Sequence, residues 1–309
     1  GADGARVAAI EHAIKRADER LVHIGMGAQR AEVMQNALAE VGRSVDDLGA
    51  GLLNSVETLH RHSRNLVVAE ARASLDETLS SLNVSFGGRP LFAGAATSES
   101  PFPGADELFE KLDAFLMADR DADASDSIED GERFADVGKL EAAIDRFFDV
   151  GNLVEDPLDA AYKPNFGEIY SARGEAASVE VDDGDRLSYA PDVNDARIID
   201  VIKALATTVK AEQWTESFVA EGADPEDVYR STGEALLQGT ADLAALRGEV
   251  GVAQERLEHA KVAREAERSA LEQARAAIVA RDPFEAASEL LDMQNRLQAL
   301  YTTTARLAN

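Results

Sequence analysis

Apolar residues recur at alternating spacings of three and four near both ends of the chain, and this pattern restricts the fold more than any other feature. Such spacing is typical of long helices that pack along one another. We therefore expect the two chain ends to form long helices that pair in an antiparallel bundle. The N-terminal positions are Val7, Ile10, Ile14, Ala17, Leu21, Ile24, Ala28 and Ala31, and the C-terminal positions are Leu243, Leu246, Val250, Ala253, Leu257 and Ala260.

Local signals predict interruptions in these long helices. Gly42-Arg43-Ser44 predicts a break, because Ser44 can cap a second helix that reaches about Leu82. Asp282-Pro283 predicts the start of a last amphipathic helix that ends near Leu307, since proline suits a first helical turn. Before that break, the C-terminal pattern is expected to continue in a slipped register at Ala263, Ala266, Ala270, Ala274 and Ile278.

The middle of the chain has a mixed pattern. A turn-rich stretch around Gly94 predicts a domain boundary. Alternating apolar residues flank Asp183-Gly184, which predicts a β-hairpin within 165–190. The expected class is therefore mainly α with an α+β insert, in which 1–94 and 210–309 form the helical core and 95–209 the inserted domain. The other expected elements are helices over 105–118, 138–149 and 195–209 and an acidic loop over 119–136.

Composition excludes several classes of protein. The formal net charge is −27, from 58 acidic and 31 basic side chains. A surface of this sign repels nucleic-acid phosphates and anionic membranes, so neither is an expected partner. The sequence has no cysteine, which rules out disulfides and thiolate chemistry. It also has no membrane-length apolar run, and we expect no cleavable signal peptide.

Candidate chemical sites are weak. Asp119 to Asp130 begins like a calcium loop, but it has Ala124 where glycine is required and Asp130 where glutamate is usual. His60 and His62 would point about 200° apart on a helix, so they cannot share one ion. No phosphate loop, nucleophile elbow or zinc helix is present in the sequence. We therefore expect no catalytic, cofactor or metal site, and not an enzyme.

Two stretches resemble a known family. Residues 82–94 read LNVSFGGRPLFAG, and 282–307 continue from DPFEAASEL to YTTTARL. Both are similar to the signatures of flagellins and hook-associated protein 3, and together they cover about 1–94 and 225–309. The signature and domain-junction residues are Asn83, Gly87, Gly88, Leu91, Phe92 and Gly94.

The resemblance implies a structural role in the bacterial flagellum. Members of this family are exported without a cleaved signal by the flagellar type III apparatus and act outside the cell. The implied partners are hook-associated protein 1, flagellin, further copies of the chain and an export chaperone. The implied task is to join the hook to the flagellin filament.

The alternatives are a flagellin filament subunit and, from another class, an intracellular coiled-coil scaffold, which the heptads alone would also suit. A calcium-binding surface protein is a further alternative. The resemblance also implies terminal polymerisation segments, which we expect to be missing or cut short here, leaving a monomer. The heptad face is expected to be mainly intramolecular core, with the outer faces of the helices as the interface. The expected assembly residues are Thr302, Thr303, Thr304 and Arg306.

Overall fold

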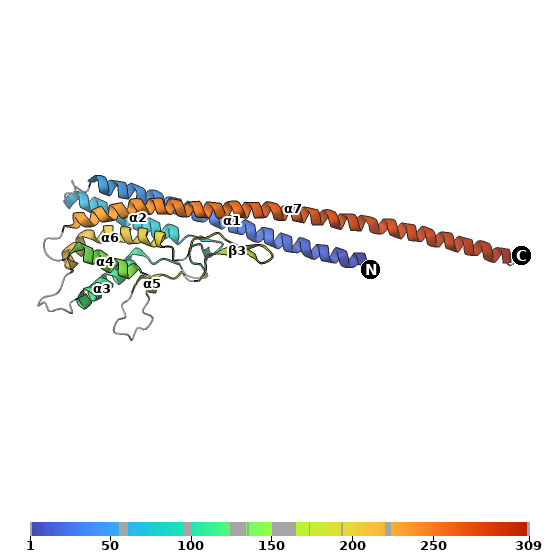
Figure 1. Cartoon of the computed structure of the whole chain (residues 1–309), viewed down its shortest axis with the longest axis horizontal. Coiled ribbons are helices and arrows are strands. Elements are labelled where there is room, and N and C mark those ends of the chain that lie inside the picture. Colours follow the sequence, from blue (N-terminus) through green and yellow to red (C-terminus); the bar gives the residue numbers. More distant parts are fainter. Residues whose placement is uncertain are drawn as a thin grey trace. The chain divides into compact units, whose positions relative to one another are not determined.

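The computed structural model describes residues 2–55, 61–94, 100–123, 134, 136–149, 165–172, 174–192, 194–219 and 224–307 (Figure 1). The helices are α1 (Ala2–Ser55), α2 (Arg61–Leu82), α3 (Ala105–Asp123), α4 (Val137–Phe148), α5 (Phe166–Ile169), α6 (Ala196–Phe218) and α7 (Pro225–Leu307). Two short strand pairs accompany them, β1 (Ser85–Phe86) with β2 (Arg89–Pro90), and β3 (Ser178–Asp182) with β4 (Asp185–Ser188). The chain is mainly helical, as the sequence predicts.

The structure divides into two compact units. Unit 1 contains residues 1–26, 180–186 and 256–309, and unit 2 contains 27–179 and 187–255. The domain division predicted from the sequence, with a core of 1–94 and 210–309 around an insert of 95–209, stays a prediction.

The predicted break at Gly42-Arg43-Ser44 is wrong, because α1 continues through it to Ser55. Ser44 does not cap a helix; its hydroxyl instead lies 2.8 Å from that of Ser74 in α2. Val41 and Val45, on either side, are fully buried. A glycine inside a helix costs about 1 kcal/mol relative to alanine, and burial of two valines is worth more than that.

The predicted break at Pro283 is wrong for a related reason. Helix α7 runs without interruption from Pro225 to Leu307. Proline removes one helix hydrogen bond, since it has no N–H to donate to the carbonyl of Val279. The loss of one bond does not end a helix that continues on both sides for many turns.

The predicted register slip in α7 is also wrong. Ala263, Ala266, Ala270 and Ala274 are exposed, whereas Leu271 and Ile278 are half-buried. These two residues extend the seven-residue spacing from buried Leu257, and Arg264 occupies the intervening position. The heptad therefore keeps its register and has an arginine in it, which sequence inspection takes for an interruption.

Helices α1 and α7 run antiparallel in unit 1. Arg268 Nε lies 2.7 Å from Asp18 Oδ1, and Arg275 Nε lies 3.3 Å from Glu11 Oε1. Seven residues forward in α7 match seven residues backward in α1, which is the register of an antiparallel heptad pair.

The same two helices also approach closely in unit 2. A Cβ built on Gly233 of α7 would lie 3.0 Å from Leu53 Cδ2 of α1. One built on Gly49 of α1 would lie 3.1 Å from Leu236 Cβ of α7. Glycine at these contacts lets the two backbones approach without a clash.

The core of unit 2 is built from helices and aromatic side chains. Helix α6 packs against α2, α3 and α4, and Figure 1 shows α2 and α6 side by side. Trp214 of α6 is fully buried, and its indole donates a 2.6 Å hydrogen bond to Asp113 of α3. Four further aromatic rings pack together around α4 and α5, Phe147, Phe148, Phe166 and Tyr170.

The predicted hairpin around Asp183-Gly184 is confirmed as β3 and β4. The helices predicted over 105–118, 138–149 and 195–209 are also present, the first and last of them longer than expected. Residues 119–123 belong to α3 rather than to an acidic loop. The remainder of that loop, apart from Phe134 and Asp136, lies outside the described residues.

Candidate assembly interface

An exposed apolar stripe follows α7 in its last third. Leu290, Met293 and Leu297 have exposed fractions of 60%, 65% and 51%, although they follow each other at spacings of three and four. This spacing normally marks the buried seam of a helix pair. Leu257, earlier on the same helix, is fully buried. The stripe is therefore a helix-packing face that the described part of the chain leaves uncovered.

The residues predicted to assemble lie just beyond this stripe. Thr302, Thr303, Thr304 and Arg306 all belong to α7, in the turns before its end at Leu307. Their side chains lie outside the described set, so their part in an interface stays a prediction.

The signature residues form a tight turn after α2. Gly87 and Gly88 connect β1 to β2 with φ angles of 60° and 76°. Successive positive φ values are the geometry of a type I′ hairpin turn, which only glycine adopts at no steric cost. The strands are antiparallel, with Ser85 opposite Pro90 and Phe86 opposite Arg89.

Asn83 holds the chain segment that follows this turn. Its side-chain amide donates to the carbonyl of Phe102, and its Oδ1 accepts from the N–H of the same residue, both at 3.0 Å. Leu91 and Phe92 are buried in the core of unit 2, and Gly94 has a φ of 61°. The signature therefore has a structural function here: it ends α2 and anchors the chain leading to α3.

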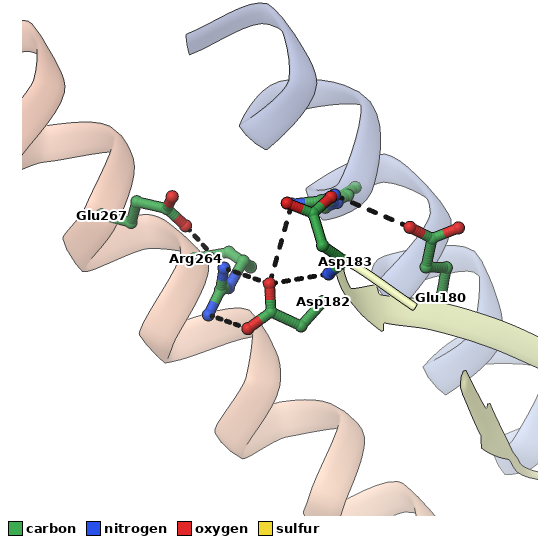
Figure 2. Close-up of polar contacts among 6 residues, drawn as sticks. Glu180, Asp182, Asp183, Arg264 and Glu267 are labelled. Carbon is green, nitrogen blue, oxygen red and sulfur yellow. Dashed lines mark hydrogen bonds and ion pairs between the residues drawn. The ribbon is translucent and has the colours of Figure 1, made fainter. Parts of the chain in front are cut away.

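Sequence inspection missed a cluster of charges in unit 1, shown in Figure 2. Arg264 of α7 makes two 3.2 Å contacts with the carboxylate of Asp182 in β3. Arg20 of α1 pairs with Asp183 and approaches Glu180 at 3.6 Å. Spacing along the sequence carries no signal for this cluster, because the hairpin and the two helices are far apart in the sequence.

The electrostatics of the cluster follow from these contacts. Burial alone would lower the pKa of Arg20, but the hydrogen bond to Asp183 and the nearby carboxylates raise it overall. The pKa of Asp182 is lowered, first by the N–H of Asp183 and then by the charge of Arg264. Both groups are therefore held in their charged forms.

The described residues offer no ion-binding or membrane-spanning arrangement. Among them, no group of three or more His, Asp or Glu side chains is arranged so that it could hold a metal ion. Asp119, the first position of the calcium-like stretch, is buried and pairs with Arg146 of α4. His60 is outside the described residues. No described helix has the length and apolar character needed to cross a bilayer.

Solved structures share this architecture. The crystal structure of Bacillus cereus FlgL aligns with a TM-score of 0.54 at 15% identity, covering 87% of this chain and 99% of that one. A flagellar hook-associated protein of Vibrio parahaemolyticus aligns with a TM-score of 0.55 at 11% identity, covering 88% and 96%. The chain has the fold of flagellar hook-associated proteins.

Comparison of structures finds this similarity, whereas comparison of whole sequences does not. No family model matches the sequence, and no curated protein matches it. At 11–15% identity the backbone arrangement is retained while most side chains differ. In this chain the Gly87-Gly88 turn and the heptads have clear structural roles, and these short motifs indicated the fold.

Proposed function

We propose that the chain is a structural subunit of the bacterial flagellum that joins the hook to the flagellin filament. In this role it has no enzymatic activity and is exported by the flagellar type III apparatus with the help of a chaperone. Its partners are hook-associated protein 1 on one side, flagellin on the other, and further copies of itself around the ring.

The uncovered stripe of Leu290, Met293 and Leu297 is the observation that carries this proposal. A net charge of −27 keeps free copies apart, so association requires burial of apolar surface. Three large side chains contribute about 1.5–3 kcal/mol each when fully buried, which suits one contact of a repeating assembly. Subunits that contact each other through two different surfaces build rings or helical lattices.

Capture at hook ends tests the proposal. Purified hooks bearing hook-associated protein 1 are incubated with the chain, washed, and then supplied with flagellin monomers. Electron microscopy should show filaments growing from hooks that received the chain and none from hooks that did not. Hooks that never bind the chain, or that support filament growth equally well without it, would refute the junction role.

The same experiment separates the two alternatives. Long filaments formed by the chain alone on filament seeds would identify a flagellin, for which the Asn83–Gly94 signature is equally suitable. Failure to bind any hook or filament end, together with a stable complex on an intracellular partner, would favour a coiled-coil scaffold.

A further inference from the structure

We infer that the tip of the β3–β4 hairpin is a carboxylate bridge on which the pairing of α1 and α7 in unit 1 depends. The bridge consists of the carboxylates of Glu180, Asp182 and Asp183. It neutralises the charges of Arg20 of α1 and Arg264 of α7. This inference concerns the chain by itself and does not rest on the proposed function.

The first step is that the two arginines are neighbours. Arg264 Nη1 lies 3.2 Å and Arg20 Nη1 lies 3.8 Å from the same oxygen, Asp182 Oδ1. A single carboxylate oxygen therefore bridges two cations that belong to different helices. Without that oxygen, the two positive charges would face each other where α1 and α7 meet.

The second step is that both arginines are largely buried, so losing their counter-charges would cost free energy. The side chains of Arg20 and Arg264 are only 16% and 18% exposed. Arg264 Nε is enclosed and has no hydrogen-bond partner among the described residues, so its guanidinium depends on its Nη contacts. Partly buried cations without counter-charges are strongly destabilising. Arg264 also occupies a heptad position between Leu257 and Leu271, where an apolar residue would need no counter-charge.

The third step is that the local structure of the hairpin tip orients its carboxylates toward the two arginines. Asp182 accepts from the N–H of Asp183 at 2.8 Å, which turns its carboxylate toward Arg264 (Figure 2). Gly184, with a φ of 75°, lets the chain reverse within two residues. Glu267 provides Arg264 with one further contact, at 2.7 Å, but only from the same helix. The link between Arg20 and Arg264 therefore passes through the hairpin, whereas Arg268 and Asp18 pair the two helices directly.

Hydrogen–deuterium exchange of the whole chain tests whether the helix pair depends on the carboxylate bridge. The Asp182→Asn/Asp183→Asn variant should accelerate exchange about fivefold or more in the hairpin and also in the facing parts of α1 and α7, around residues 14–26 and 257–271. Asp185→Asn is the matched control, because Asp185 lies on the same hairpin and makes no ion pair with any described residue. It should leave both helices unchanged.

A third variant distinguishes a carboxylate bridge that stabilises the helix pair from contacts that only hold the hairpin in place. Adding Arg20→Gln to Asp182→Asn/Asp183→Asn removes one of the two facing cations, so exchange in α1 and α7 should slow again toward the wild-type rate. If Arg20→Gln instead accelerates exchange further, or if the first variant affects the hairpin alone, the inference is overturned.

Ionic strength provides a second measurement on the unmodified protein. The screening length falls from about 10 Å at 0.1 M salt to about 3 Å at 1 M. Helix exchange in the wild type should therefore rise with salt, whereas the Asp182→Asn/Asp183→Asn variant should respond much less. An equal salt response of the two proteins would also overturn the inference.

Discussion

At the scale of single residues, close approach of helices in unit 2 depends on glycines in α7. A Cβ built on Gly239 would lie 2.6 Å from Val201 Cγ2 of α6, a distance that real structures do not tolerate. Val201 is 1% exposed and β-branched, so it has little freedom to move aside. Gly248, further along α7, has no atom within 4 Å of the equivalent position.

We predict opposite effects for alanine at these two glycines. Gly239→Ala should lower the free energy of unfolding by about 1–3 kcal/mol, because it overpacks the α6–α7 contact. Gly248→Ala should raise it by about 0.5–1 kcal/mol, since alanine favours the helix and meets nothing. Urea denaturation of each variant measures both effects.

The cause of the Gly239→Ala penalty can be isolated in a second background. In a Val201→Ala protein the nearest remaining side-chain atom is Val201 Cβ, 3.9 Å from the built position, which is an ordinary contact. Gly239→Ala should then cost little or nothing. An undiminished penalty would show that the clash with Val201 is not its source.

At the scale of elements, charged residues connect helices that the apolar pattern alone does not order. Arg197, at the start of α6, contacts both carboxylate oxygens of Glu249 in α7, at 2.7 and 3.0 Å. The hydrogen bonds that Arg197 donates to Asp195 and Glu249 raise the pKa of Arg197 above its ordinary value. The pKa of Glu249 is lowered in turn, chiefly by its hydrogen bond with Arg197.

This pair predicts a pH-dependent contribution to stability. A carboxylate whose pKa is lower in the folded state stabilises the fold above its unfolded pKa, here about 4.5, and loses that contribution as pH falls through the folded value. Glu249 is 62% exposed, so the contribution near pH 7 is only about 0.5–1 kcal/mol. Glu249→Gln should therefore be less stable than the wild type at pH 7 and equal to it near pH 3.

Urea denaturation at several pH values measures this difference. Glu234→Gln is a suitable control, because Glu234 is exposed on the same helix and makes no ion pair with a described residue. Its difference from the wild type should stay near zero throughout. A Glu249→Gln difference that is independent of pH would mean that packing, and not charge, connects α6 to α7.

Some of these features could be predicted from the sequence and others could not, for physical reasons. Long heptads and the Gly87-Gly88 turn are local patterns, and the structure confirms them. The break at Gly42 was wrong because tertiary packing outweighs a local cost of about 1 kcal/mol, and the break at Pro283 was wrong because the loss of one hydrogen bond does not end a long helix. Arg264 was missed because an arginine in a heptad is interpretable only once its partner Asp182, far away in the sequence, is known.

At the scale of the whole molecule, a large negative charge and an uncovered apolar stripe oppose each other. The charge of −27 favours separate copies, whereas burial of Leu290, Met293 and Leu297 favours association. In the proposed role, assembly depends on a surface that contributes little to folding of the chain itself. Folding and assembly should consequently respond to different substitutions.

We predict that Leu290→Ser/Leu297→Ser abolishes capture of the chain at hook ends without lowering its stability. Both side chains are more than half exposed, so serine removes few intramolecular contacts, and the urea midpoint should move little. The matched control is Leu291→Ser: Leu291 is equally exposed at 60%, but Gln294, Asn295 and Gln298 follow it at helical spacing. Electron microscopy of hooks should show normal capture of the control and none of the double variant. Equal capture of the two would place the assembly surface elsewhere on the chain, and a large loss of stability in the double variant would show that the stripe belongs to the fold.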